Sequence, residues 1–345
     1  MKPAFPLILL TLTLICTPIS LHAGEIIINA VGDIMLAGRW ASVLKANGYE
    51  YPFAAVKAEL AGGDINIANM ESPTATGGRE YTGKQFRFRA EPAVAKAVRA
   101  AGFNLVTLAN NHSMDFGGEA LAETLQHLDS AGIAWIGAGE NRDEARKMAL
   151  YNIKGKKVAF LGYSLTQPIE FFAGKTRPGT APGYEKIVTT DVASARRQAD
   201  YVIVSFHWGK EASTTVQEYQ RNAAHRAIDA GADVIIGHHP HVLQGIERYK
   251  QGLIFYSLGN FAFASKSTTA DVSALIRLRL DDRQRIAEIL PLDVLHRRVG
   301  FQPRILSGKR AEDVIDKLNL LSRPFKTVIH NRDEKFTINF SDNQQ

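Results

Sequence analysis

Apolar segments rich in β-branched residues recur along this chain, and most of them run directly into a cluster of polar residues. The first three span residues 26–31, 64–68 and 103–109. A short apolar run bounded by polar and glycine residues predicts a buried strand that enters a loop. The chain must therefore fold around a sheet whose strand ends carry polar side chains.

Helical patterns separate these strands. The predicted helices span residues 91–101, 119–131 and 216–230, and the further buried strands span 158–163, 201–206 and 234–236. Alternating strands and helices predict an α/β fold. In open α/β sheets, ligands bind beyond the carboxyl ends of the strands, which is where the polar clusters lie. The pattern changes after residue 253, where additional strands are expected over 253–256, 272–280, 286–290 and 326–340, with one helix over 311–321.

Composition excludes several classes of protein. The chain has 345 residues, of which 45% are hydrophobic and 22% charged, so a disordered or fibrous chain is excluded. The net charge of +6 suits an anionic substrate but does not argue for nucleic acid. Cys16 is the single cysteine, which excludes internal disulfides and a cysteine-based zinc site.

The N-terminus is typical of an export signal. Lys2 precedes an apolar run over residues 5–19, and Ala23 offers a small residue for cleavage. We expect residues 1–23 to be a signal peptide and the protein to be periplasmic or on the cell surface. An uncleaved signal that anchors the protein in the membrane is the alternative.

Imidazole and carboxylate side chains are concentrated after the predicted strands. Five of the ten histidines and four acidic residues share this location: His112, His207, His238, His239, His241, Asp33, Glu71, Asp115 and Glu211. Such ligands suit Mn, Fe or Zn, and two adjacent metal ions need a bridging carboxylate. Taken singly, the segments at Asp33, His112 and His207 are more typical of a turn, a loop cap and a core imidazole than of a metal site. The segment His238-His239-Pro240-His241 is different, because packing does not explain three imidazoles within four residues.

The ordered motifs resemble those of the CapA family of bacterial capsule synthesis proteins, which is linked to poly-gamma-glutamate. The similarity covers residues 28–265, and the motifs that carry it occupy residues 32–39, 69–73, 108–117, 207–211, 237–244 and 256–261. This family is similar in turn to the calcineurin-like metallophosphoesterases. The resemblance implies a metallophosphatase-like four-layer α/β/β/α sandwich with additional C-terminal strands. We expect one such domain over residues 24–300, with residues 301–345 packed on it as an extension.

The resemblance also implies roles for individual residues. The expected ligands of one or two divalent metal ions are Asp33, Glu71, Asn111, His207, His239 and His241, with Glu71 near the bridging position. His112 would protonate the leaving group or stabilise charge, with Asp115 beside it. His238 is an extra imidazole whose role could be exchanged with that of His239. In two places the chain departs from the phosphoesterase pattern: Met35 replaces a histidine ligand, and Glu71 replaces an aspartate.

Other polar residues are expected around this centre. Glu211 could orient an imidazole, and Asn260 lies in the last motif. Residues 84–89 alternate in a way that predicts an edge strand with Arg87 and Arg89 on one face. Those two guanidinium groups and that of Arg39 could bind an anionic chain, although a solvated strand face fits Arg87 and Arg89 as well.

Two functions from different classes follow. The first is an exported, metal-dependent hydrolase acting on a phosphoester or an anionic polymer during capsule biosynthesis or export. The second is a non-catalytic subunit that binds polymer or membrane proteins of a synthesis complex, with a degenerate metal site. Met35 favours the second, whereas the intact histidine motifs favour the first. An exported nuclease or nucleotidase is a third, less supported reading, and we expect no nucleic acid partner. Oligomeric state, the identity of the metal and the substrate are left open.

Overall fold

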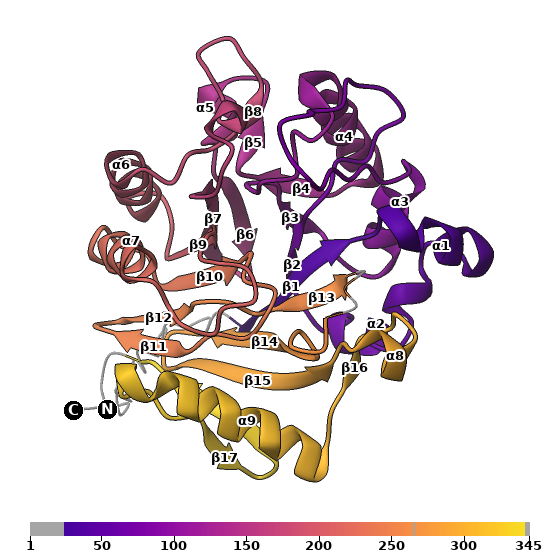
Figure 1. Cartoon of the computed structure of the whole chain (residues 1–345). Helices are drawn as coiled ribbons and strands as arrows, with labels where there is room; N and C mark the ends of the chain where they lie inside the picture. Colours follow the sequence, from indigo (N-terminus) through magenta and orange to yellow (C-terminus); the bar gives the residue numbers. More distant parts are fainter. Residues whose placement is uncertain (1–23, 264, 266, 342–345) are drawn as a thin grey trace, which may run out of the picture.

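Two β-sheets packed face to face form the centre of the molecule, and helices cover the outer face of each (Figure 1). The computed structural model describes residues 24–263, 265 and 267–341. The expected signal peptide therefore lies outside the described residues. Within them, none of the helices combines the length and the apolar character that crossing a membrane requires.

The first sheet has ten strands and the second has six. The first consists of β1 (Ile26–Met35), β2 (Ile65–Met70), β3 (Leu105–Thr107), β4 (Ala134–Ile136), β13 (Asn260–Phe263), β14 (Val272–Leu280), β15 (Arg285–Asp293), β16 (Arg304–Ile305), β17 (His330–Arg332) and β18 (Lys335–Asn339). The second consists of β6 (Ala149–Ile153), β7 (Lys156–Ser164), β9 (Tyr201–His207), β10 (Val234–His238), β11 (Ile246–Tyr249) and β12 (Gly252–Phe255). A two-stranded ribbon pairs β5 (Ala138–Gly139) with β8 (Gly179–Thr180).

Alternation along the strands explains the layers. In β2, Ile65 and Ile67 point into the core between the sheets, whereas Ala68 and Met70 belong to the core beneath the helices. In β9, Ile203 faces the other sheet, and Val202 and Val204 face the helices on the opposite side. Strands that are apolar on both faces are expected where a sheet is covered on both sides.

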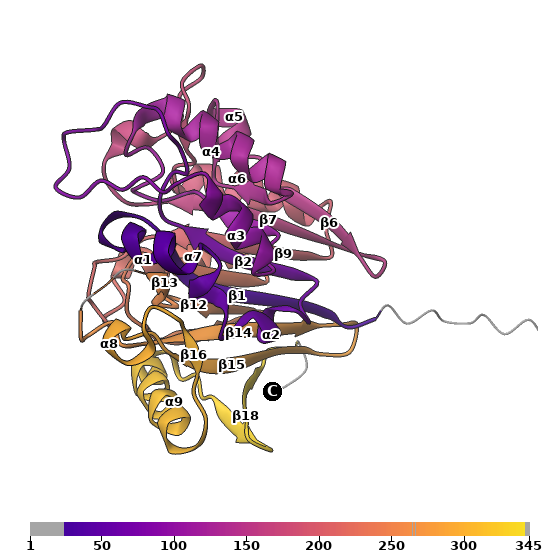
Figure 2. The same cartoon turned by 90° about the vertical axis from the view of Figure 1, so that its right-hand side faces the viewer.

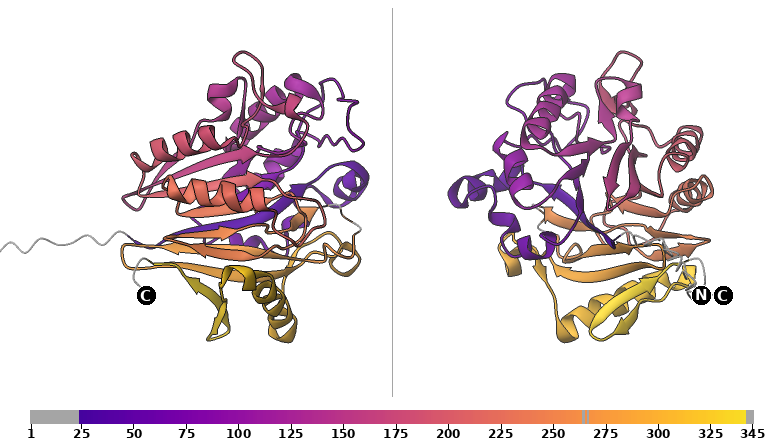
Figure 3. Two further views of the ribbon diagram at one scale, coloured as in Figure 1. Left: turned by 60° about the vertical axis from the view of Figure 1, so that its left-hand side comes forward. Right: turned by 180° about the vertical axis from the view of Figure 1, so that it is seen from behind.

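The helices complete the outer layers (Figures 2 and 3). The first sheet is covered by α1 (Ala41–Asn47), α2 (Lys57–Leu60), α3 (Ala93–Ala100) and α4 (Gly117–Ala131), and the second by α5 (Arg142–Ala145), α6 (Glu185–Arg196) and α7 (Glu218–Asp229). The short α8 spans His296–Val299, and α9 (Gly308–Ser322) packs on β15 and β11. The four-layer α/β/β/α order is therefore confirmed.

The C-terminal part of the chain also contains the additional strands. In this region β16 and β18 pair with β15, so residues after 300 extend the first sheet. The prediction for 272–280 matches β14 residue for residue. The predicted strand over 326–340 is instead a hairpin of two strands, because Asp333 and Glu334 adopt positive φ angles at a turn. The division into a domain at 24–300 and an extension at 301–345 stays a prediction.

Parallel pairing puts the polar strand ends at one edge of each sheet. In the first sheet β1, β2 and β3 are parallel, and in the second β7, β9, β10 and β12 are parallel. Asp33 is paired with Asn69 across β1 and β2, and His207 with His238 across β9 and β10. The two sheets thus present acidic and imidazole side chains along neighbouring edges.

Asn66 joins three segments behind this edge. Its side-chain amide donates to the carbonyls of Leu60 and Gly102 at 2.9 and 2.8 Å, and its oxygen accepts from Asn29 at 2.8 Å. We predict that Asn66→Ala lowers the free energy of unfolding by about 2–4 kcal/mol, because buried polar groups lose their partners. Urea denaturation measures this change.

Asn47→Ala is the matched control. The Asn47 amide donates to the Val43 carbonyl at 2.9 Å on the exposed surface of α1, so we expect a change below about 0.5 kcal/mol. Equal losses of stability in the two variants would contradict the role assigned to Asn66.

Candidate metal centre

Polar side chains from both sheets meet above the strand ends. Asp33 lies on β1, Glu71 follows β2, and Asn111 and His112 follow β3. From the second sheet, β9 ends at His207, and β10 ends at His238 just before His239 and His241. The structure brings all of these predicted residues together.

Asp33 is held from three directions and is fully buried. Its Oδ1 accepts from Asn69 Nδ2 at 2.8 Å and lies 3.3 Å from His238 Nδ1, and its Oδ2 lies 3.0 Å from His241 Nδ1. Burial alone would raise the pKa of Asp33, but the hydrogen bonds from His238 and His241 lower it well below its usual range. Asp33 is therefore a carboxylate in the folded protein.

Glycine at position 32 makes this placement possible. A Cβ there would lie 1.8 Å from the Gly259 carbonyl oxygen. The same carbonyl accepts the Asp33 backbone N–H at 3.0 Å. Close approach of β1 and β13 thus sets the position of the Asp33 carboxylate.

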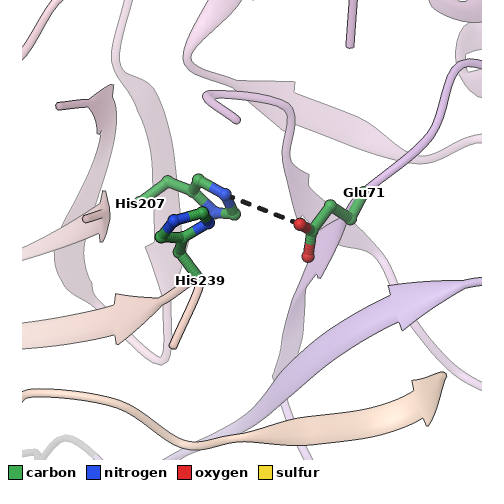
Figure 4. A group of neighbouring side chains, drawn as sticks. All are labelled: Glu71, His207 and His239. Atoms are coloured by element: carbon green, nitrogen blue, oxygen red, sulfur yellow. Dashed lines mark ion pairs between the residues drawn. The ribbon is translucent and has the colours of Figure 1, made fainter. Parts of the chain in front are cut away.

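Glu71 is the second fully buried carboxylate. Its Oε2 accepts from Asn69 Nδ2 at 3.2 Å, and its Oε1 lies 3.6 Å from His207 Nε2 and 3.7 Å from His241 Nε2. Figure 4 shows it facing His207 and His239 across the gap between the sheets. Burial and the neighbouring Asp33 raise the pKa of Glu71 well above its usual value. A cation would favour the charged form of this group.

The imidazole of His207 is oriented by amides. Its Nε2 lies 2.8 Å from Asn111 Oδ1, and its Nδ1 lies 3.3 Å from Asn69 Nδ2. Burial and the nearby His239 keep the pKa of His207 well below its usual value. Neutral imidazoles are the form that binds metals.

His239 and His241 depend on an unusual backbone. Their φ angles are +94° and +61°, a left-handed region that residues other than glycine rarely adopt. Burial and the neighbouring His241 lower the pKa of His239 to about 3. Burial opposes protonation of His241 too, yet Glu71 and Asp33 raise its pKa to about 9. This loop thus holds one neutral imidazole and one that is charged when only protein groups surround it.

The ligand atoms form three overlapping groups, each with its atoms within 4.8 Å of one another. They are Glu71–His207–His239, Asp33–Glu71–His241 and Glu211–His239–His241. Glu71, His239 and His241 each belong to two of the groups, and Glu71 is the one carboxylate among these three. Such spacing is compatible with ligands at about 2.0–2.2 Å from a common ion.

Unpartnered buried atoms also fit a metal. Among the described residues, Glu71 Oε1 and His239 Nδ1 are buried with no hydrogen-bond partner. Leaving such atoms unpaired is unfavourable, and a bound cation would satisfy the carboxylate oxygen directly. The donor set of imidazole, carboxylate and amide oxygen suits Mn, Fe or Zn.

Met35 removes one expected type of ligand from the site, and Glu211 adds a carboxylate that was not expected as a ligand. Met35 is 3% exposed and belongs to the apolar core around β1. Glu211 was expected to orient an imidazole, but the structure places its carboxylate near enough to His239 and His241 to be a ligand itself. Asn260 Oδ1 lies 3.0 Å from His241 Nδ1 and orients that ring, as its place in the last motif suggested.

His112 is linked to Asp115 and to a lysine that the sequence did not single out. His112 Nδ1 lies 2.6 Å from Asp115 Oδ2, and Lys84 Nζ lies 2.6 Å from Asp115 Oδ1. Lys84 Nζ also contacts the Asn111 carbonyl. Burial lowers the pKa of His112 and that of Lys84. Asp115 therefore orients the His112 ring through Nδ1 and leaves Nε2 of His112 for other partners.

The predicted edge strand over residues 84–89 is wrong. These residues form an irregular loop, because the Phe88 N–H donates to Asp115 Oδ2 at 2.8 Å in place of a strand partner. Arg87 pairs with Glu80 at 2.9 Å, and Arg89 donates to the Gly77 carbonyl at 2.9 Å. Both guanidinium groups are engaged in this loop region, not at the carboxylate–imidazole cluster. The Arg39 side chain lies outside what the structure describes.

Lys84 and Asn69 were missed for different reasons. Lys84 lies in the same segment as the arginines. The alternation of phenylalanine and arginine along that segment indicated a role for Arg87 and Arg89 and not for Lys84. Asn69 was visible as the first residue of the 69–73 motif. Its amide contacts Asp33, Glu71 and His207 at once, which only the pairing of β1 with β2 reveals.

Comparison with known proteins agrees with the motifs. The model of the family described as "Bacterial capsule synthesis protein PGA_cap" matches residues 27–265. A capsule biosynthesis protein CapA of Bacillus anthracis is 34% identical over 278 residues, covering 78% of this chain and 68% of that protein. A PGA biosynthesis protein CapA of Bacillus subtilis is 33% identical over 268 residues, covering 76% and 70%.

A solved structure is also similar at a lower level. The NAD nucleotidase of Haemophilus influenzae has a TM-score of 0.47 and 14% identity, covering 88% of this chain and 63% of that one.

The shared position of Glu71 leads to a test of metal content. We predict that the purified protein binds about two divalent ions and that Glu71→Gln binds close to none. The reason is that the groups Glu71–His207–His239 and Asp33–Glu71–His241 would each lose a ligand. Elemental analysis after dialysis against Mn, Fe or Zn measures the content.

Glu211→Gln and Glu312→Gln serve as comparisons. Glu211 belongs to a single group and is exposed, so its variant should lose at most one ion. Glu312, on the exposed surface of α9, should retain the wild-type content. Full metal content in Glu71→Gln would show that Glu71 is not a shared ligand.

Proposed function

The chain belongs to the bacterial capsule synthesis protein family, and from this premise we propose that it is an exported, metal-dependent hydrolase. It would act on a phosphoester during assembly or export of an anionic polymer of the poly-gamma-glutamate type. The observation that carries the proposal is the cluster of Asp33, Glu71, His207, His239 and His241 with its shared carboxylate.

The residues of the cluster would form two neighbouring metal sites. Glu71, Asn111, His207 and His239 would hold one ion, and Asp33, Glu71 and His241, with Glu211 adjacent, a second. A metal bound there would polarise the phosphoryl oxygen and lower the pKa of a bound water. Asn69 keeps both carboxylates in place, and His238 and Asn260 orient Asp33 and His241.

His112 is the group proposed to donate a proton to the leaving oxygen. Its Nδ1 faces the Asp115 carboxylate, which favours the charged imidazole and partly opposes the larger effect of burial, which lowers the His112 pKa. This contact leaves Nε2 for the substrate. Lys84 forms an ion pair with Asp115 and so fixes the loop that carries Phe88. The centroids of the Phe88 and His112 rings are 5.0 Å apart. Asp115 and Lys84 are positioning residues in this scheme.

Met35 supports the second candidate, a non-catalytic subunit that binds polymer or membrane proteins. A buried thioether stands where the phosphoesterase pattern has an imidazole, and thioethers are poor ligands for hard or borderline metals. A site with one filled group and no turnover would fit this role.

Hydrolysis of phenyl phosphate by the metal-loaded protein separates the two candidates, because the phenol that leaves is a weak acid whose oxygen needs a proton. We predict that EDTA abolishes turnover and that His112→Asn lowers kcat by roughly 10²–10⁴ without changing metal content, because the proton donor is lost. His330→Asn, an exposed position on β17, is the matched control and should behave like wild type.

If the protein binds its full content of metal but hydrolyses neither phosphomonoesters nor phosphodiesters, the hydrolase proposal is wrong. The binding role would then be tested by retention of poly-gamma-glutamate on the immobilised protein.

A further inference from the structure

A cavity of about 340 Å³ opens directly beside the metal cluster. Met35, Phe86, Phe88 and Phe263 form an apolar wall of this cavity. Its polar lining consists of His112, Glu211 and His241 at the metal cluster and of the hydroxyl residues Ser265, Ser267 and Thr269. Pockets of this size bind small molecules or one part of a larger substrate. We propose that this cavity binds the leaving group of the substrate, and that the leaving group is an apolar alcohol, either aryl or alkyl. The inference rests on the proposed hydrolase function.

Phenyl rings contact, at a tilt, the imidazoles that border the cavity. The Phe88 and His112 ring centroids are 5.0 Å apart, and those of Phe263 and His241 are 4.6 Å apart. Met35 adds a thioether to the same wall. A carboxylate or sugar hydroxyl placed on this aromatic side, away from Ser265, Ser267 and Thr269, would lose water without gaining a partner, which is unfavourable. An apolar group would bury its surface there at no such penalty.

The position of His112 determines which part of the substrate occupies the cavity. In hydrolysis of a phosphoester, the bond from phosphorus to the alcohol oxygen breaks and a water oxygen bonds to phosphorus. The departing oxygen takes a proton from His112, and the proton that the attacking water loses passes through solvent to reprotonate His112, so that the products are the alcohol and phosphate. Because His112 lines the cavity, the departing alcohol must lie at its mouth. The phosphoryl group remains at the carboxylate–imidazole cluster.

Phe86 extends the apolar wall to the rim. Its side chain is 60% exposed, although a phenyl ring gains free energy when it is buried. It stands on the loop that Asp115 fixes through Lys84 and Phe88. A bound alkyl chain or ring would cover Phe86, which gives this exposed side chain a function. Within the proposed role, the bond that is cleaved would join phosphate to an apolar carrier, not two units of the anionic polymer.

Binding of phosphonates that are not hydrolysed tests the cavity independently of turnover. The probes are hexylphosphonate, phenylphosphonate and 2,3-dihydroxypropylphosphonate, measured by calorimetry on the metal-loaded protein. Each buried methylene is worth roughly a factor of four in affinity, so we expect hexylphosphonate to bind at least about tenfold tighter than the dihydroxypropyl probe. Preference for the phenyl probe over the hexyl probe would assign an aryl group, and the reverse an alkyl chain.

Phe86→Ser should reduce the tenfold preference to about twofold or less. Leu320→Ser is the matched control, because Leu320 is 57% exposed on α9 and does not line the cavity, and it should retain the preference. Equal binding of the three probes, or tighter binding of the dihydroxypropyl probe, would overturn the inference. A retained apolar preference in a protein without phosphatase activity would leave the cavity assignment standing and remove the proposed hydrolysis.

Discussion

Two carboxylates buried side by side, Asp33 and Glu71, constrain everything around them. Removing a charged group from water costs several kcal/mol unless partners replace the water. Those partners come from the opposite sheet: His238 and His241 face Asp33, and His207 faces Glu71. The two sheets must therefore pack in the one relative position that brings these groups together. Gly32 allows β13 to lie close to β1, which fixes the place of Asp33 in that packing. A cation that fits between the groups would complete the compensation.

Strain accompanies this arrangement. His239 and His241 both have left-handed backbone angles, which cost of order 1–3 kcal/mol each for residues other than glycine. The surrounding contacts, including the Asp33 Oδ2 that lies 3.4 Å from the His239 N–H, hold them in place. A loop that is kept strained and buried beside unpaired ligand atoms is typical of a functional site rather than of a connection.

Local patterns predicted the alternation of strands and helices, and the family resemblance implied the four layers, which the structure confirms. The metal ligands stay a prediction, although the structure brings their side chains together. Apolar runs determine where β1, β9 and β10 lie, and the residues that follow them must meet where parallel strands end. The loop at 84–89 was predicted wrongly, because its alternation is local whereas its conformation depends on Asp115, which arrives from a different segment. The role of Asn69 and the reach of Lys84 likewise depend on distant pairings that no single segment contains.

The site is divided along the chain as well as between the sheets. Asp33 and the His239 N–H that faces it are separated by 206 positions. During synthesis the acidic half of the centre emerges long before the imidazole half. Until the second sheet is made, Asp33 and Glu71 have no imidazole partners and remain better solvated than buried. The centre can therefore close only after the second sheet has formed, so its completion depends on completion of the fold as a whole.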